Sequence, residues 1–349
     1  MELLPTIWFI AIAVLWTGYL FLEGFDLGVG MLMKLFARNN TERRVLLNTI
    51  GPVWDGNEVW LLTAAGATFA AFPLWYASLF SGLYLPLLLV LVALIFRAVA
   101  FEYRGKVDTE SWRARWDWAI ALGSLVAAFG VGAALALTTT GLPLNANGDR
   151  EGGPFSWFSG YAVVGGLAVA GFSLLHALAF LALKTDGDIR HRARRWFVRL
   201  LPLLLLPMAG WALSIQLLDG KPWTWALAAL AVLAASAAWM LARQGAEGRA
   251  FMALGGFLLL GSASIFGAVF PVVLPSTLNP AFDLTISNAS SSDYTLGLMS
   301  IVAAVGLPLV IAYQAWTYWV FRRRVSASHI PEAHSFLPAV AAKAFTTKG

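Results

Sequence analysis

The sequence predicts an all-α integral membrane protein with about nine transmembrane helices, and its composition and apolar runs carry that prediction. Of its 349 residues, 59% are hydrophobic and only 12% are charged, which is about half the charged fraction of ordinary soluble domains. Apolar runs of about 18 or more residues recur along the chain, and each is long enough to cross about 30 Å of hydrocarbon as a helix. Helices are the expected element because backbone amides in lipid must be hydrogen-bonded within their own segment.

The predicted spans follow one another with no hydrophilic stretch long enough for a separate soluble domain. In chain order they are Ile7–Phe36, Gly51–Phe72, Tyr76–Tyr103, Trp116–Thr139, Trp157–Leu183, Trp196–Leu218, Trp223–Ala242, Phe251–Leu274 and Tyr294–Phe321. We therefore expect one polytopic membrane domain over residues 1–325, with a first bundle over about 1–140 and a second part over about 155–321. A cytoplasmic tail over 326–349 follows. The first span lacks a basic leader and a small-residue cleavage site, so it is expected to be a retained helix.

The basic residues predict the orientation of these spans. All but three of the 24 Lys and Arg residues lie at the ends of the odd-numbered spans that face one side, or in the tail. The exceptions are Arg150 and Lys221 on the opposite side and Arg97 within a span. By the positive-inside rule, the N-terminus is expected outside and the C-terminus in the cytoplasm. The same asymmetry explains the pI near 9.6 without a nucleic-acid partner.

Ionisable side chains within the predicted spans gather in the N-terminal third of the chain. The first, second and third spans contribute, in pairs, Glu23 and Asp26, Asp55 and Glu58, and Arg97 and Glu102. Charged groups at membrane depth are costly and are by default functional candidates. Each carboxylate pair of the first two spans is three residues apart, which places both members on one helix face.

The estimated depths of these groups are similar. Counted from Lys34, Asp26 lies about 12 Å and Glu23 about 17 Å into the membrane at about 1.5 Å per residue. Arg97 lies about 10 Å in, counted from Arg104. Three helices thus place polar groups in the cytoplasmic half, a pattern that predicts a proton or cation inlet from the cytoplasm. The plainer interpretation is a structural ion pair of Arg97 with one carboxylate, the others capping helix ends.

Haem or metal ligation by this chain is not expected from its histidines. The chain has four, which are His176, His191, His329 and His334. Only His176 lies in a predicted span, and it has no partner at helical spacing, so a hydrogen-bonded core residue is the simpler interpretation. The absence of cysteine excludes disulfides, thiolate metal sites and c-type haem attachment.

The charged segments also carry a family resemblance. Four ordered blocks resemble subunit II of the cytochrome bd quinol oxidases: Glu23–Gly30 (EGFDLGVG), Arg38–Arg44 (RNNTERR), Gly51–Trp60 (GPVWDGNEVW) and Phe96–Arg104 (FRAVAFEYR). The likeness is dense over about residues 1–125 and returns at Phe270–Ser292 and Ala315–Trp319. Several ordered blocks are more specific than any single short motif.

The resemblance implies a fold, a partner and an activity. The family fold has two four-helix bundles and a peripheral helix, and it pairs with a subunit I that carries two haems b and one haem d. The heterodimer lies in the bacterial cytoplasmic membrane, oxidises quinol, and reduces O2 to water with protons from the cytoplasm. It generates proton motive force without pumping. Small single-helix accessory subunits are further candidate partners, together with a structural quinone.

The resemblance also implies roles for individual residues. Asp26 and Asp55 match carboxylates on the cytoplasmic proton route, with Glu23, Arg97 and Glu102 in supporting positions. Trp54 matches a position beside a bound structural quinone. Trp60 matches a residue lining a lateral O2 path, although packing against lipid or core explains this residue equally well.

Two other functions remain open from the sequence. A proton-coupled secondary transporter or channel also places carboxylates and an arginine at depth, but it usually shows broken helices in two matching halves. Here the polar cluster is confined to one third of the chain and to the cytoplasmic half, which favours a one-sided inlet serving a partner. A purely structural scaffold does not explain Asp26 and Asp55 together.

Overall fold

The computed structural model describes residues 3–330, which form twelve α-helices and one small sheet. The helices are α1 Leu3–Leu35, α2 Asn40–Ile50, α3 Trp54–Ala71, α4 Pro73–Gly82, α5 Tyr84–Tyr103, α6 Glu110–Thr140, α7 Gly160–Lys184, α8 Gly187–Leu204, α9 Leu206–Asp219, α10 Pro222–Arg243, α11 Glu247–Val269 and α12 Asp293–Val320. Strands β1 (Val272–Leu274) and β2 (Leu284–Thr285) pair antiparallel. The predicted tail lies mostly outside the described residues.

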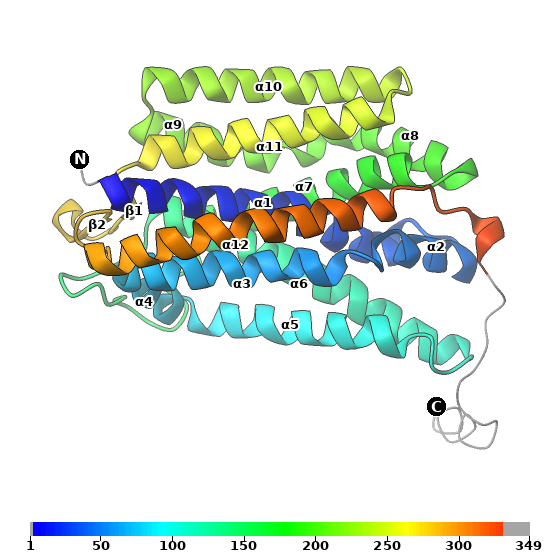
Figure 1. The fold of residues 1–349 in the computed structure, drawn as a ribbon, viewed down its shortest axis with the longest axis horizontal. Coiled ribbons are helices and arrows are strands. Elements are labelled where there is room, and N and C mark those ends of the chain that lie inside the picture. Colours follow the sequence, from blue (N-terminus) through cyan, green and yellow to red (C-terminus); the bar gives the residue numbers. More distant parts are fainter. Residues whose placement is uncertain (1–2, 331–349) are drawn as a thin grey trace.

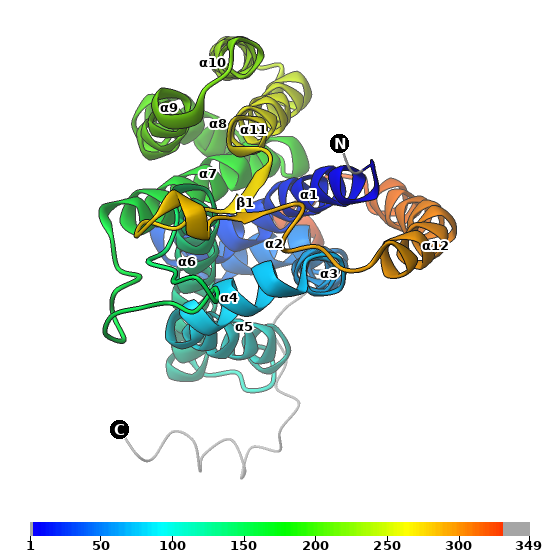
Figure 2. The same cartoon turned by 90° about the vertical axis from the view of Figure 1, so that its left-hand side faces the viewer.

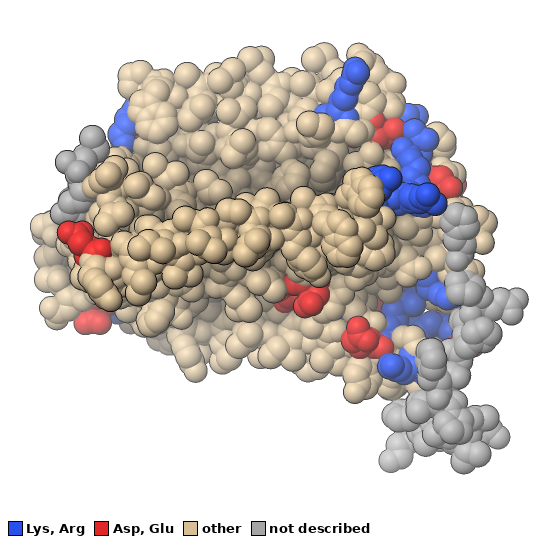
Figure 3. All heavy atoms as spheres, in the orientation of Figure 1, with Lys and Arg blue, Asp and Glu red and all other residues tan. Residues whose placement is uncertain are grey.

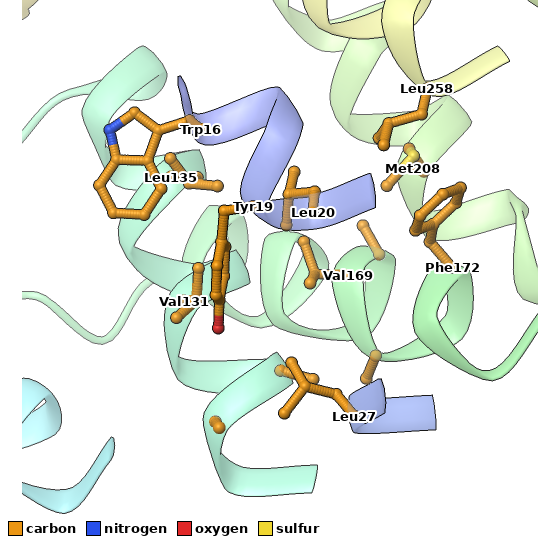
Figure 4. Close-up of a cluster of buried hydrophobic side chains, with 14 of the residues drawn as sticks. Trp16, Tyr19, Leu20, Leu27, Val131, Leu135, Val169, Phe172, Met208 and Leu258 are labelled. Carbon is orange, nitrogen blue, oxygen red and sulfur yellow. The ribbon is translucent and has the colours of Figure 1, made fainter. Parts of the chain in front are cut away.

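The long helices run side by side in one bundle (Figure 1), with α1, α6 and α7 packed on one another at its centre. Figure 2 views the bundle along the helices and shows α12 on its flank, beside α1 and α3. The central helices bury a continuous apolar core (Figure 4), which includes Tyr19 and Leu20 of α1, Val131 and Leu135 of α6, and Val169 and Phe172 of α7. Because α7 shares this core, helices on both sides of the predicted division at 140–155 pack together, and the division stays a prediction.

Within residues 3–330, eight helical segments are long and apolar enough to cross a membrane, which confirms the predicted fold class. They are Leu3–Leu35, Tyr84–Tyr103, Glu110–Thr140, Gly160–Lys184, Gly187–Asp219, Pro222–Arg243, Glu247–Val269 and Asp293–Val320. The predicted second span corresponds to α3, which has 18 residues and packs on α1 but begins with a polar turn. The chain is therefore a multi-pass membrane protein.

Several predicted boundaries are wrong, and local chemistry explains them. An unpredicted helix, α2, precedes α3 and is capped by Asn39, whose side chain accepts from the Glu42 amide at 2.9 Å. The third predicted span is two helices, α4 and α5, that meet at Leu83, and the sixth is α8 and α9, which meet at Leu205. Pro86 in the first turn of α5 and Pro207 in the first turn of α9 favour a new helix at these two breaks, because proline has no amide hydrogen to donate. The eighth predicted span ends early, at Val269.

Small residues permit close helix contacts along α1. A Cβ added at Gly28 would overlap the Ser173 carbonyl oxygen of α7, and one at Gly30 would overlap the Ser124 side chain of α6. At Gly18 an added Cβ would overlap the Trp60 ring. The sequence therefore lets backbones approach where a larger residue would separate the central helices.

Charged side chains gather at one end of the bundle, which we call the basic end (Figure 3). Three carboxylates there hold five arginines in ion pairs: Glu42 with Arg192, Asp188 with Arg38, Arg192 and Arg195, and Glu247 with Arg190 and Arg194. The paired residues lie on α2, α8 and α11, except Arg38, which lies in the loop before α2. The ion pairs therefore join these three helices. The basic end is the side that the charge asymmetry predicts to be cytoplasmic.

Candidate functional site

Among the described residues, Arg97 on α5 is the largest charged side chain that is fully buried, and carboxylates from two other helices contact it. Its Nη1 lies 2.8 Å from Glu23 Oε1 of α1 and 3.4 Å from Glu58 Oε2 of α3. Its Nε donates to Ser124 Oγ of α6 at 3.2 Å, and its guanidinium lies 5.0 Å from the centre of the Phe101 ring. Arg97 and Glu23 are fully buried. We name Glu23, Asp26, Glu58 and Arg97 the Arg97 cluster.

Asp26 is also fully buried and is held by an amide chain that reaches α12. Asn57 Nδ2 donates to Asp26 Oδ2 at 2.6 Å. Asn57 Oδ1 accepts from the Tyr318 hydroxyl at 2.8 Å and from Gln314 Nε2 at 3.0 Å. Trp60 Nε1 donates to Gln314 Oε1 at 2.8 Å, which closes the chain on α3. The peripheral helix α12 therefore positions a carboxylate of α1 through Asn57.

Sequence reasoning missed Asn57, Gln314 and Tyr318. A signal was present, because Gln314 is an uncharged polar residue in an otherwise apolar span and Tyr318 follows four residues later on the same face. Neutral polar groups in lipid need partners as charged ones do, although each costs less.

Several buried polar atoms of the cluster have no protein hydrogen-bond partner within the described residues. They are Tyr19 Oη and Arg97 Nη2, together with both oxygens of Glu23 and Asp26 Oδ1 when both carboxyls are ionised; a proton on one carboxyl lets Glu23 and Asp26 bond to each other. The Glu23–Arg97 contact is an ion pair. Tyr19 lies one turn from Glu23 on α1, deeper in the membrane. Buried polar atoms are almost always paired, by protein or by ordered water. The cluster thus presents donors and acceptors to water molecules.

The structure separates the predicted carboxylates into a buried and an exposed set. Glu23 and Asp26 are inside, Glu58 is 20% exposed, and Asp55 and Glu102 are exposed. The carboxylate of the second span that lies near those of the first span is therefore Glu58, one turn after Asp55; Glu58 and Glu23 contact the same Arg97 atom. The roles of Asp55 and Glu102 stay predictions.

The two tryptophans with predicted ligand roles are packed within the protein. Trp54 is half-buried, with its ring centre 4.8 Å from that of Phe101. Trp60 is half-buried against Gly18 and bonded to Gln314. The quinone and O2 roles stay predictions beside these observed contacts.

The environment of His176 does not fit a haem ligand. Its Nε2 lies 2.9 Å from the Phe21 carbonyl oxygen, which only accepts, so Nε2 carries the proton. Aromatic rings enclose the imidazole, with ring centres between 4.7 and 5.7 Å away: Phe21, Phe25, Phe172 and Phe251. No group of three His, Cys, Asp or Glu that could hold a metal occurs in the described part of the chain.

A second buried ion cluster lies near the basic end, and the sequence did not reveal it. Asp117 at the start of α6 is fully buried, and its Oδ1 accepts from Arg104 Nε at 2.5 Å. Its Oδ2 lies 3.6 Å from Arg43 Nε, and Arg104 Nη2 donates to Asn40 Oδ1 at 2.8 Å. These contacts fasten α2 to α5 and α6, with cations in excess of carboxylates.

Comparisons with known proteins give one consistent result. The family described as "Cytochrome bd terminal oxidase subunit II" matches residues 4–321. "Cytochrome bd ubiquinol oxidase subunit 2" of Bacillus subtilis is 44% identical over 332 residues, covering 93% of this chain and 98% of that protein. "Cytochrome bd-I ubiquinol oxidase subunit 2" of Escherichia coli K12 is 34% identical over 369 residues, covering 94% and 97%.

A solved structure shares the fold. The bd oxidase of Geobacillus thermodenitrificans matches with a TM-score of 0.73 at 21% identity, covering 91% of this chain and 98% of the matched chain. Together with the sequence matches, this result favours an oxidase subunit over a secondary transporter or channel.

Proposed function

Because the chain belongs to the cytochrome bd terminal oxidase subunit II family and is thus a subunit of a quinol oxidase complex, we propose that it delivers protons from the cytoplasm to a haem-bearing partner. The observation that carries this proposal is the Arg97 cluster. It places three carboxyl groups and one arginine, from three helices, at membrane depth. One guanidinium balances the charge of only one carboxylate, so the remaining acidic groups are available to take up and release protons.

The proposed route follows the order of exposure. Asp55 and then Glu58 lie one turn apart on α3, the first exposed and the second half-buried. Glu58 contacts Arg97, and Arg97 contacts the fully buried Glu23. Asp26 lies one turn from Glu23 on the same face of α1. Water molecules paired with the partnerless oxygens would carry protons between these groups.

The partner supplies the redox chemistry in this proposal. A subunit I with two haems b and one haem d oxidises quinol on the outer side and reduces O2 to water. This chain's residues hold and move protons, and Asn57 orients Asp26 for that task. Since protons are consumed from the cytoplasm and released outside, charge is separated across the bacterial cytoplasmic membrane without a pump.

We infer that the partner subunit covers the face of α3 that is exposed on the surface of this chain. Val59 and Leu62 are exposed on this helix and lie four and seven residues after Asp55. Asp55 and these two apolar side chains therefore share one face of α3. Leu88 and Leu91 of the neighbouring α5 are exposed too. The partner would then adjoin Asp55 and Glu58, the exposed end of the route, in place of lipid.

The structural quinone near Trp54, an O2 path along Trp60 and single-helix accessory subunits remain parts of the proposal that rest on the family resemblance alone. Both tryptophans have sufficient packing partners within this chain. Their roles therefore need the intact complex for a test.

The test uses the purified two-subunit complex in proteoliposomes. Asp26→Asn and Glu23→Gln each remove a titrating carboxyl and keep its shape, so we expect quinol-driven O2 consumption to fall about 100-fold, the usual contribution of one positioned proton-transfer group. Haem content, read from the visible spectrum, reports assembly. Asp188→Asn at the basic end is the matched control and should keep full turnover. Unchanged turnover of Asp26→Asn with full haem content would remove that residue from the route.

A further inference from the structure

An apolar groove runs along one face of the molecule beside α1 and α11 (Figure 3), and no residue of the Arg97 cluster lines it, although Tyr318 of the amide chain to Asp26 does. Near the outer end it opens into a cavity of about 330 Å³, and toward the basic end into one of about 490 Å³. The lining residues Ile10, Val14, Thr17 and Phe21 recur at helical spacing on α1, so both cavities lie along a single stripe of that helix.

The cavity at the basic end, which we call the basic-end cavity, joins apolar walls to a cationic rim. Its walls include Phe21, Phe25, Phe180, Leu183 and Phe251. Its rim has three cations at the ends of two helices: Lys184 is the last residue of α7, and Arg322 and Arg324 follow α12. No acidic residue lines it.

The rim cations differ from the five arginines of the basic end that Glu42, Asp188 and Glu247 hold in ion pairs. Lys184, Arg322 and Arg324 form no ion pair within residues 3–330. Their hydrogen bonds go to backbone carbonyls instead. Lys184 Nζ donates to Phe321 and Arg323, Arg324 Nη1 to Thr185 at 2.6 Å, and Arg322 Nη1 to Trp319 at 2.6 Å. An ammonium has three N–H groups and a guanidinium has five, so each rim cation retains donors and its full charge.

We propose that the basic-end cavity binds one anionic phospholipid, whose phosphate contacts the rim cations and whose acyl chain lies in the groove. Charge complementarity supports this occupant, because three cations without carboxylates adjoin an apolar cavity of about 490 Å³. Position supports it too, since the rim lies at the basic end, where the predicted cytoplasmic leaflet carries its anionic headgroups. The lipid would thereby fill the space between α12, α1 and α7, beside the hydrogen bonds that already join the end of α7 to the segment after α12.

The experiment measures lipid retained by the intact, detergent-purified complex in native mass spectrometry, with phosphatidylglycerol and phosphatidylcholine added in turn. We expect one phosphatidylglycerol to be retained in preference to phosphatidylcholine. The double variant Arg322→Gln/Arg324→Gln should lower its retention about tenfold or more, as expected for two lost cations near a charged membrane surface. Arg323→Gln is the matched control, because Arg323 lies between the two residues but does not line the cavity.

Two further variants distinguish a bound phospholipid from other occupants of the cavity. Leu183→Trp narrows the apolar part and leaves all three cations, so it should also reduce retention. If the double variant loses haem, Arg322→Gln alone decides the question, since its guanidinium bonds only to its own helix end. Equal retention of both lipids, displacement by inorganic phosphate alone, a quinone recovered in place of the lipid, or unchanged retention in Arg322→Gln would each overturn the proposal.

Discussion

The Arg97 cluster and the ion pairs of the basic end use the same two chemical groups in opposite proportions. In the cluster one arginine meets three carboxyl groups, deep in the bundle and with several buried atoms unpaired. At the basic end five arginines meet three carboxylates near the surface. An excess of buried acid suits proton uptake, whereas an excess of surface cations fixes topology and attracts anionic lipid. The count of partners, more than their chemistry, distinguishes the two regions.

The largest effect is expected from Arg97→Met. Removing the only cation of the cluster leaves Glu23 and Glu58 buried without a counter-charge, and breaking a buried pair from one side costs about 3–5 kcal/mol. The thermal midpoint of the complex and its haem content should both fall. The double variant Arg97→Met/Glu23→Gln should recover part of the loss. A single variant as stable as the wild type would show that the cluster is not held by this charge.

A smaller effect is expected from Gln314→Leu and Tyr318→Phe. Each removes one hydrogen bond to Asn57, so Asp26 is less firmly oriented while no carboxyl group is lost. We expect turnover to fall several-fold, with stability changed by about 1 kcal/mol. Turnover and thermal midpoint are measured together, and Thr317→Val on the same helix is the control. A drop in stability with full turnover per assembled complex would assign the two residues to packing alone.

Arg190→Gln tests an ordinary pair of the basic end. Its guanidinium makes two bonds to Glu247, at 2.9 and 2.8 Å, but Arg194 remains 3.6 Å from the same carboxylate. Because that second cation compensates, we expect a loss of at most about 1 kcal/mol and unchanged turnover. Chemical denaturation in detergent provides the measurement. A loss as large as that of Arg97→Met would erase the distinction between the two regions.

The smallest effect is expected from Arg38→Gln. Arg38 and Asp188 are more than half exposed and lie 3.3 Å apart, so water and salt screen the pair. Neither the thermal midpoint nor turnover should change measurably at physiological salt. A clear change would indicate that a partner buries this surface in the complex.

Parts of the site were predictable because they follow from the type of each residue and its spacing along the chain. Glu23, Asp26 and Arg97 stand out as charges in apolar runs, and their depth follows from the helical rise. Asp55 is grouped with them by its place in a predicted span and by the family resemblance, but Glu58 contacts Arg97 and Asp55 is exposed. Residues three apart share a face, yet their spacing does not say which one the neighbouring helix contacts. Asp117 was missed because it lies at the edge of a span, where a charge ordinarily faces water.

The sequence by itself determined that the chain crosses a membrane many times, where its polar groups lie along each helix, and which end carries the basic residues. These follow from hydropathy, length and charge, which are local properties. Only the tertiary structure decided the helix breaks at Leu83 and Leu205, the hydrogen bond between Asn57 and Asp26, and the position of α12 beside α1 and α3. Those depend on how helices rotate and approach one another. Side-chain packing between distant segments sets that geometry, and a one-dimensional pattern does not record it.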